Sequence, residues 1–274
     1  MTDLYAVMGN PINHSKSPTI HSKFAEQAKQ DLVYSAMLVP TEGFEPAVKD
    51  FFKGHGRGLN ITVPFKEKAY QLANSLTPRA QTAEAVNTLV LQEDGTIMGD
   101  NTDGAGLVRD LVMNQKVDIA GKKLLVIGAG GAVRGILQPF LEQAPESITI
   151  VNRTFEKAQL LANSFEEYGD IKAKGFDELT EPFDVIINGT SASLAGELPP
   201  LPDAVIAQHT CVYDMMYGKE LTPFLQWAQQ QGAEKVIDGL GMLVEQAAVS
   251  FEIWRGVKPN SIEVLQDLRE HLLA

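Results

Sequence analysis

The stretch "KKLLVIGAGGAVRGILQPFL", residues 122–141, decides the fold of this sequence. An apolar strand pattern runs into three glycines, Gly128, Gly130 and Gly131, and then directly into a helix pattern. Glycine allows a tight turn and lets the backbone approach a pyrophosphate, which the free N–H groups and positive dipole end of the helix attract. Because Val133 stands where a third glycine would complete the usual motif, a tight turn without a ligand stays an alternative.

The following strand pattern ends in "TIVNRT", residues 149–154, and concerns the choice of cofactor. An NAD site usually has Asp or Glu about 20 residues after the glycines, where it accepts from the ribose 2′-hydroxyl. Here Asn152 and Arg153 occupy that place, and a guanidinium suits the 2′-phosphate of NADP. Thr154 and Lys157 lie close enough in sequence to assist. The pattern therefore predicts NADP, with a solvated surface charge as the alternative for Arg153.

Alternating strand and helix patterns around this motif predict an α/β protein. A chain of 274 residues is long enough for about two domains. The alternation before Thr102 predicts one α/β layer with a mostly parallel sheet, and a second alternating block follows it. Two helix patterns, at 241–256 and 260–274, close the chain. From the pattern alone these helices could pack on the second block or return to the first.

The composition excludes several classes of protein. With 23 Lys and Arg against 35 Asp and Glu, the net charge of −12 is a poor match for nucleic acid or an anionic membrane. The single cysteine, Cys211, permits neither an intramolecular disulfide nor a thiolate metal site, and such usage fits a reducing cytosol. The first 21 residues contain no apolar run typical of a signal peptide or a membrane span. We therefore expect a cytoplasmic protein without a metal, and with neither nucleic acid nor a membrane as its partner.

Polar side chains gather near the ends of the predicted strands in the first block. They are Ser15 and Ser17 in "NHSKSPT", Asn60, Thr62 and Lys66 in "NITVPFK", Asn87 in "AVNTL", and Asn101 and Asp103 in "GDNTDGAG". Each has an ordinary alternative as a helix cap, a turn residue or a solvated charge. Because strand ends and their loops converge at one edge of a parallel sheet, we expect these groups to line one small cleft. Hydroxyls, amides, a lysine and an aspartate suit a polyhydroxylated acid rather than an apolar ligand.

Nine short segments, in order along the whole chain, resemble the shikimate dehydrogenase family, NADP-dependent enzymes of aromatic amino-acid biosynthesis. They are "GNPINHSKSP" at 9–18, "NITVPFK" at 60–66, "AVNTL" at 85–89, "GDNTDG" at 99–104, "GAGGAVR" at 128–134, "NRT" at 152–154, "NGTSAS" at 188–193, "YDMMY" at 213–217 and "DGLGMLVEQA" at 238–247. The resemblance implies a mixed α/β substrate domain over residues 1–102, completed by the returning helices in residues 240–274. It also implies a Rossmann-type, doubly wound parallel-sheet NADP domain over residues 103–239.

The resemblance also implies roles for individual residues. It makes Lys66 and Asp103 the catalytic pair, with Lys66 as general acid/base and Asp103 as its orienting partner. The implied shikimate-binding residues are Ser15, Ser17, Asn60, Thr62, Lys66, Asn87, Asp103, Tyr217 and Gln246. The implied NADP-binding residues are Gly128, Ala129, Gly130, Gly131, Ala132, Asn152, Arg153, Thr154, Met215 and Gly239, to which the sequence spacing adds Lys157.

The family reaction is the reversible reduction of 3-dehydroshikimate to shikimate with NADPH, so shikimate is the expected small-molecule partner. Two alternatives stay open. One is a related dehydrogenase with relaxed use of quinate and of both cofactors, and the other is a non-catalytic NADP-binding sensor. Intact Lys66 and Asp103 argue against the sensor. A homodimer stays an open expectation for the assembly.

Overall fold

The computed structural model describes residues 2–190, 192 and 197–273. Ser191 and Ser193, in the segment "NGTSAS", lie outside the described residues. The chain forms two compact units, one of Met1–Gly106 with Leu243–Asp267 and the other of Leu107–Met242 with Leu268–Ala274. We call them unit 1 and unit 2. In the part of the chain that is described, no helix combines the length and the apolar character needed to cross a membrane.

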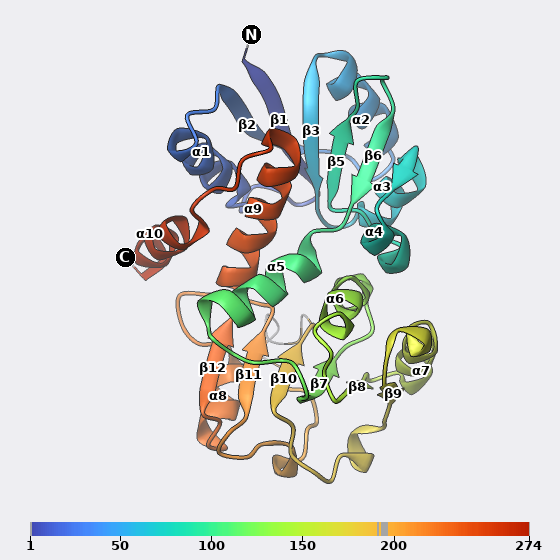
Figure 1. Ribbon diagram of the computed structural model, residues 1–274, viewed down its shortest axis with the longest axis vertical. Coiled ribbons are helices and arrows are strands. Elements are labelled where there is room, and N and C mark those ends of the chain that lie inside the picture. Colours follow the sequence, from blue (N-terminus) through green and yellow to red (C-terminus); the bar gives the residue numbers. More distant parts are fainter. Residues whose placement is uncertain (1, 191, 193–196, 274) are drawn as a thin grey trace. The chain divides into compact units, whose positions relative to one another are not determined.

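Unit 1 contains a six-stranded mixed sheet with strand order β2-β1-β3-β5-β6-β4 (Figure 1). Its strands are β1 (Asp3–Gly9), β2 (Leu32–Leu38), β3 (Gly56–Ile61), β4 (Ser75–Leu76), β5 (Thr88–Leu91) and β6 (Ile97–Asp100). β1 pairs in parallel with β2 and β3, whereas β5 runs antiparallel to both β3 and β6. Only residues 92–96 join β5 to β6, and a parallel pair would need a much longer crossover. This part of the sheet therefore departs from the mostly parallel arrangement expected for the first block.

Helices pack on both faces of the unit 1 sheet. The helices in this part of the chain are α1 (Ser17–Gln27), α2 (Phe44–Lys53), α3 (Lys66–Leu72), α4 (Pro78–Ala83), α5 (Asp103–Arg109), α9 (Leu240–Arg255) and α10 (Ser261–Leu273). Side chains alternate along a strand, so Met8 packs in one core with Phe44 of α2, while Tyr5 packs with Trp254 of α9 on the other face. A side chain at Gly58 would collide with the Trp254 ring. Glycine at this position therefore lets α9 lie directly on the sheet.

Unit 2 contains a six-stranded sheet, order β12-β11-β10-β7-β8-β9, in which every pair is parallel. Its strands are β7 (Lys123–Ile127), β8 (Ser147–Val151), β9 (Ile171–Ala173), β10 (Val185–Asn188), β11 (Cys211–Asp214) and β12 (Lys235–Asp238). The chain runs outward from β7 to β9 on one side and from β10 to β12 on the other. The order therefore reverses between β7 and β10, where ligands of open α/β sheets bind at the carboxyl ends of the strands.

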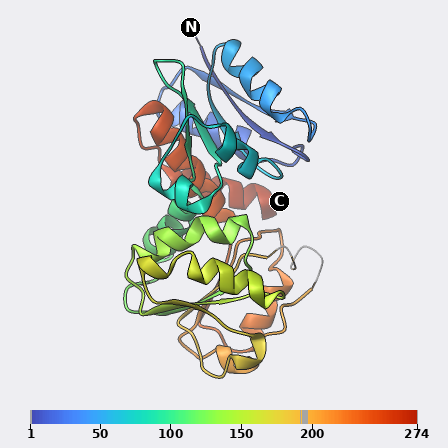
Figure 2. The same ribbon diagram turned by 90° about the vertical axis from the view of Figure 1, so that its right-hand side faces the viewer.

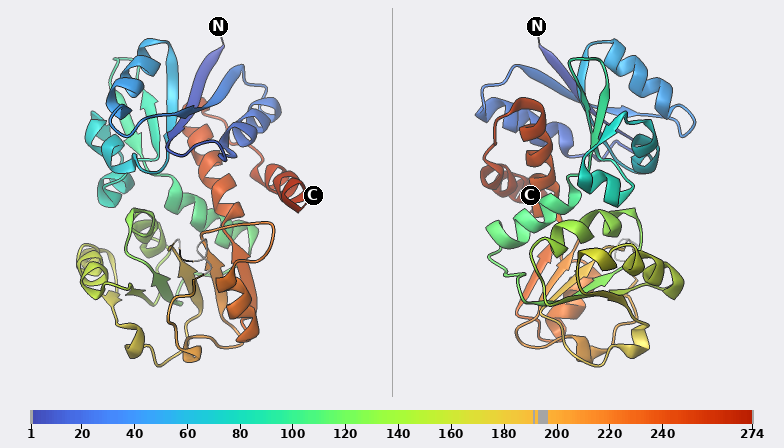
Figure 3. Two further views of the ribbon diagram at one scale, coloured as in Figure 1. Left: turned by 180° about the vertical axis from the view of Figure 1, so that it is seen from behind. Right: turned by 45° about the vertical axis from the view of Figure 1, so that its right-hand side comes forward.

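The two faces of the unit 2 sheet carry different sets of buried side chains. Leu124 and Val126 of β7 face the core that contains α6 (Gly131–Leu141) and α7 (Phe155–Asn163), which lie together over the sheet in Figure 2. Leu125 and Ile127 face a second core with α8 (Pro223–Gln230), which is visible in the view from behind (Figure 3). Helices thus cover both faces of a parallel sheet, and the predicted Rossmann-type fold of this part is confirmed.

Candidate active site

A lysine–aspartate ion pair lies at one edge of the unit 1 sheet. β3 ends at Ile61, the chain turns through Pro64, and Lys66 is the first residue of α3. Phe65 is fully buried against Phe44, with 4.7 Å between the ring centroids, and this contact anchors the turn. Asp103 begins α5, directly after β6, and its Oδ2 lies 2.5 Å from the Lys66 Nζ. The lysine side chain keeps 26% of its surface exposed, so its ammonium is held by a carboxylate yet remains reachable from solvent.

Asn87 holds the other oxygen of Asp103. The antiparallel course of β5 brings Asn87, which precedes this strand, to the edge where β3 ends. The Asn87 Nδ2 donates to Asp103 Oδ1 over 2.8 Å, and also to the Thr102 hydroxyl over 2.9 Å and the Gln246 Oε1 over 3.3 Å. Each carboxylate oxygen of Asp103 therefore has its own donor, which fixes the plane of the carboxylate toward Lys66.

Asn60 is buried, and both ends of its side-chain amide make hydrogen bonds within unit 1. The Asn60 Oδ1 accepts from the Tyr34 hydroxyl over 2.7 Å. Its Nδ2 lies 3.1 to 3.2 Å from the Ser250 hydroxyl, the Thr88 hydroxyl and the Asn87 carbonyl. The Asn60 Oδ1 has one donor among these contacts and a second lone pair, so it can still accept from a substrate hydroxyl, whereas the Nδ2 is fully engaged.

The remaining polar residues predicted for the substrate lie on three segments. Ser15 and Ser17 lie at the start of α1, where the Ser17 backbone N–H donates to the Ser15 Oγ over 3.3 Å. Thr62 follows β3 and is half-buried, and Gln246 is half-buried on α9. Unit 1 thus brings Gln246 into hydrogen-bond contact with Asn87, whereas Tyr217 belongs to unit 2.

An arginine that the sequence analysis missed supports the loop that carries Asp103. Arg79 of α4 donates two hydrogen bonds of 2.7 Å each to the carboxylate of Asp100, the last residue of β6. Burial pushes the pKa of Asp100 upward, but the hydrogen bonds and charge of Arg79 outweigh it and hold the pKa below its usual value. Asp100 therefore stays ionised and receives the Asn101 backbone N–H at 2.7 Å. Arg79 carried no sequence signal beyond its position in a helix pattern.

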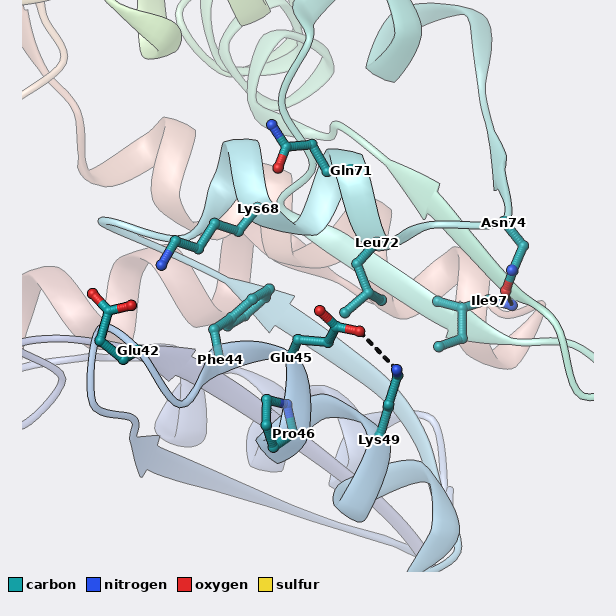
Figure 4. A pocket seen from close by; sticks show the side chains of 10 residues that line it. All are labelled: Glu42, Phe44, Glu45, Pro46, Lys49, Lys68, Gln71, Leu72, Asn74 and Ile97. Carbon is teal, nitrogen blue, oxygen red and sulfur yellow. Dashed lines mark hydrogen bonds and ion pairs between the residues drawn. The ribbon is translucent and has the colours of Figure 1, made fainter.

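A hollow of unit 1 lies apart from the Lys66–Asp103 pair and has a different lining (Figure 4). It has a volume of about 560 Å³ and is lined by residues of α2, α3 and β6 with their flanking residues, among them Phe44, Leu72 and Ile97. The two cations there are already engaged, because Lys49 pairs with Glu45 and Lys68 donates to the Thr41 carbonyl. The polar cluster around Lys66, rather than this hollow, is therefore the better candidate for a reactive acid.

The glycine turn of unit 2 has the open backbone that a pyrophosphate requires. Gly128 follows β7 with φ of +112°, a conformation that favours glycine. Gly130 precedes α6 and makes no side-chain cap, so the first backbone N–H groups of the helix are not capped from this position. A Cβ added at Gly130 or Gly131 would meet nothing within 4 Å. Gly130, Gly131 and Ala132 are exposed, and this cradle fits the phosphates of a dinucleotide.

The residues predicted to select NADP lie after the neighbouring strand. Asn152 follows β8, and its Nδ2 donates to the Thr154 carbonyl over 2.8 Å, which shapes the turn into α7. Arg153, Thr154 and Lys157 are all exposed on this turn. An exposed guanidinium beside a lysine, with no carboxylate at the end of β8, fits a phosphate better than a ribose hydroxyl.

The residues predicted for the nicotinamide end lie after β11 and β12. The Gly239 backbone N–H donates to the Met216 carbonyl over 3.1 Å, and a Cβ on Gly239 would collide with the Met215 carbonyl. Glycine here therefore permits the two strand ends to meet. Burial and the nearby charge of Asp238 raise the pKa of Tyr217, so its hydroxyl stays a neutral donor.

Cys211 does not resemble a nucleophile. It is buried at the start of β11, and burial raises the pKa of its thiol to about 12. Among the described residues, no cluster of three or more His, Cys, Asp or Glu side chains is arranged to hold a metal ion.

Comparisons with known proteins cover the whole chain. The family model described as "Shikimate dehydrogenase substrate binding domain" matches residues 7–89, and "Shikimate / quinate 5-dehydrogenase" matches residues 110–195. The model "Shikimate 5'-dehydrogenase C-terminal domain" matches residues 239–266. A protein named shikimate dehydrogenase (NADP(+)) from Alkalilimnicola ehrlichii is 59% identical over 269 residues, which cover 98% of this chain and 99% of that protein.

Solved structures agree with these matches. An Ael1 enzyme from Pseudomonas putida has a TM-score of 0.94 at 44% identity, over 97% of this chain and 98% of that one. A shikimate 5-dehydrogenase from Thermus thermophilus, solved in complex with NADP(H) and shikimate, has a TM-score of 0.88 at 30% identity. That match covers 99% of this chain and 100% of the Thermus chain.

Proposed function

The chain belongs to the shikimate dehydrogenase family, and we propose that Lys66 and Asp103 perform the proton transfer of its reaction. That reaction is the NADP-dependent, reversible reduction of 3-dehydroshikimate to shikimate. The observation that carries the proposal is the 2.5 Å contact between Lys66 Nζ and Asp103 Oδ2, with Asn87 on the other carboxylate oxygen.

The chemistry at Lys66 follows from where charge develops. Bound NADPH supplies the hydride, so negative charge grows on the substrate carbonyl oxygen. The Lys66 ammonium stabilises this oxygen and then donates its proton to it. In the reverse direction Lys66 accepts a proton from the shikimate hydroxyl. Asp103 orients the ammonium and also accepts from a substrate hydroxyl, while Asn87 keeps the carboxylate in place.

The rest of the substrate shell is proposed as follows. The hydroxyls of Ser15 and Ser17 donate to the substrate carboxylate, which hydroxyls can hold without a full positive charge, and the predicted role of the Tyr217 hydroxyl for shikimate stays part of this proposal. Thr62 and Gln246 contact the ring hydroxyls, and the predicted contact of Asn60 stays part of this proposal. Residues 128–132 would hold the pyrophosphate of the dinucleotide and Arg153 its 2′-phosphate, with Asn152, Thr154 and Lys157 assisting, and Met215 and Gly239 would serve the nicotinamide end.

A spectrophotometric assay of NADPH formation with shikimate tests the proposal directly. We expect Lys66→Ala to lower kcat by about 100- to 10,000-fold, the range of general acid–base catalysis, while KM changes much less. Lys68→Ala is the matched control, because Lys68 lies on the same helix but donates to the Thr41 carbonyl. If KM rose and kcat held in Lys66→Ala, Lys66 would bind substrate rather than transfer a proton.

The same assay distinguishes the two alternatives. Turnover of quinate at a rate similar to that of shikimate, with either cofactor, would indicate the paralogue with relaxed specificity. NADP binding without any turnover of shikimate would indicate a sensor. We expect turnover of shikimate with NADP and a much weaker reaction with quinate.

The functional division of the chain, its assembly and its compartment are also proposed. We assign residues 1–102 and 240–274 to substrate and residues 103–239 to NADP. A homodimer in the cytoplasm, without nucleic acid as a partner, is the expected state, and light scattering of the purified protein tests the assembly.

A further inference from the structure

Three hydroxyl groups form a buried cluster next to Asn87, the residue that donates to Asp103 of the Lys66–Asp103 pair. They belong to Thr88 of β5, Thr102 and Ser250 of α9, and each of these residues has 0% of its surface exposed. The Thr88 Oγ1 lies 2.8 Å from the Ser250 Oγ, which in turn lies 3.2 Å from the Thr102 Oγ1. Because none of the three reaches solvent, they can influence the reaction only through residues that touch the substrate.

The cluster sets the orientation of the Asn87 amide. The Thr102 backbone N–H lies 2.9 Å from one end of this amide. A backbone N–H can only donate, so this end is the oxygen, and the Thr88 hydroxyl donates to the same oxygen over 2.9 Å. The nitrogen of Asn87 therefore faces Asp103 Oδ1. A reversed amide would place an oxygen against the carboxylate and leave the Thr102 N–H without an acceptor.

The orientation of the Asn60 amide follows from the Asn87 backbone carbonyl, which lies 3.2 Å from one end of that amide. A carbonyl can only accept, so this end is the nitrogen, and it also donates to the oxygens of Thr88 and Ser250. The Asn60 oxygen accepts from the Tyr34 hydroxyl over 2.7 Å. The Thr88 oxygen accepts from Asn60, and the Asn87 Oδ1 can only accept, so the Thr88 proton is the one directed to Asn87 over 2.9 Å. The Ser250 Oγ lies 2.8 Å from the Thr88 Oγ1 and donates to the Gln246 carbonyl over 3.1 Å.

We propose that Thr88 is a positioning residue for the reaction, one that acts through Asn87 on Asp103 and thereby on the Lys66 ammonium. The Ser250 hydroxyl and the Asn60 amide nitrogen lie within hydrogen-bond distance of the Thr88 hydroxyl and hold it in place. The inference rests on the proposed function of Lys66 and Asp103. Its physical content is that loss of the Thr88 hydroxyl removes one of the donors to the Asn87 oxygen and leaves the Thr102 N–H and hydroxyl at 2.9 and 3.2 Å. An amide held by fewer donors moves over a wider range, and the carboxylate then holds the lysine in several orientations rather than one.

Two substitutions separate positioning from mere folding. Thr88→Val keeps the shape and removes the hydroxyl, whereas Thr88→Ser keeps the hydroxyl and removes a methyl group. We expect Thr88→Val to lower kcat about 10- to 100-fold with KM changed less than about threefold, since only the reacting geometry is lost. Thr88→Ser should restore kcat to within about threefold of the unaltered protein. Thr149→Val, in the buried part of β8, is the control for replacing a strand threonine.

A second measurement does not depend on turnover. The side-chain amide of Asn87 gives an NMR signal whose hydrogen exchange reports its hydrogen bonds. We expect exchange to be at least tenfold faster in Thr88→Val than in the unaltered protein, and to remain slow in Thr88→Ser. Slow exchange in Thr88→Val, or a kcat within twofold of the unaltered protein, would overturn the inference. If the unaltered protein failed to turn over shikimate, the proposed function would fail while the exchange rates still decided whether Thr88 positions Asn87.

Discussion

The two candidate binding regions are built on opposite principles. In unit 1, Lys66, Asp103 and Asn87 hold one another, and buried hydroxyls hold Asn87 in turn. In unit 2, the glycine turn offers exposed backbone at Gly130 and Gly131 and an exposed Arg153. The substrate region is therefore preorganised by side chains, whereas the cofactor region is an open surface that a ligand must complete.

The difference fits the role that we propose for each region. Proton transfer needs one geometry of lysine and carboxylate, and buried hydrogen bonds supply it before the substrate arrives. A dinucleotide needs an extended binding surface, N–H groups that donate to its phosphates and little steric hindrance. Exposed backbone supplies these. Substitutions among the buried groups that hold Asp103 should consequently change rates and folding together, and substitutions on the open side of unit 2 should change binding alone.

The largest effect that would sharpen this comparison is expected at Arg153. We expect Arg153→Ser to lower the ratio of kcat/KM for NADP over NAD by about 10- to 100-fold, since hydrogen bonds to a charged group contribute about 1.5–3 kcal/mol. Because Arg153 is exposed, the melting temperature should not change. Steady-state kinetics with both cofactors, together with thermal melts, measure this.

Lys122→Ser is the control for Arg153, because Lys122 precedes β7 at the opposite end from the glycine turn. The ratio should be unchanged in this control. A preference of the unaltered protein for NAD would sink the assignment of Arg153 to the 2′-phosphate.

A buried histidine provides the next test, on the side of unit 1. His21 has 1% of its surface exposed and stacks on Tyr34, with 4.2 Å between the ring centroids. Burial lowers its pKa from 6.5 to about 3. At pH 5 the unfolded chain therefore binds a proton there that the folded protein does not, so stability is complete above pH 6.5 and is lost as the pH falls toward 3. From pH 7.5 to pH 5 the loss at this one group is about 2 kcal/mol.

We expect His21→Phe to remove this part of the pH dependence. Trp254, whose ring centroid lies 5.3 Å from that of His21, reports the unfolding of unit 1 by fluorescence when Trp227 is replaced by Phe. Urea titrations at pH 7.5 and pH 5 supply the free energies of unfolding. His209→Phe, at a histidine side chain with 59% of its surface exposed, should leave the pH dependence as it is. An equal loss of stability in His21→Phe and the unaltered protein would contradict the assignment.

The smallest effects should separate two glycines of the same turn. Gly128→Ala puts a side chain at φ of +112°, with its Cβ 3.1 Å from the Thr190 Cγ2, and should cost about 1–2 kcal/mol of stability. Gly131→Ala meets open space and should melt like the unaltered protein while it binds NADP more weakly. Thermal melts with and without NADP measure both effects. Equal melting temperatures of the two variants without NADP would refute the strain at Gly128.

Local sequence patterns predict much of this arrangement. The alternating strand and helix patterns predict an α/β protein, and the resemblance of the motifs implies the family and its Rossmann-type NADP domain; the fold and the comparisons confirm these predictions. The residue roles remain predictions. The antiparallel course of β5 and the two-residue strand β4 were not predicted. A period-2 pattern states which face a strand buries but not which neighbour it pairs with, and two residues carry no period at all.

The sequence by itself determined which chemical groups the protein has and that they follow strand ends, because turn residues and periodicity are local properties. Only the tertiary structure decided that Thr88, Ser250 and Tyr34 join the hydrogen-bond network of Asn60 and Asn87, and that Arg79 holds Asp100. A threonine in a strand pattern and a serine in a helix pattern look like ordinary buried residues until the chain folds. Hydrogen bonds between residues 88 and 250 depend on distances that no local pattern encodes.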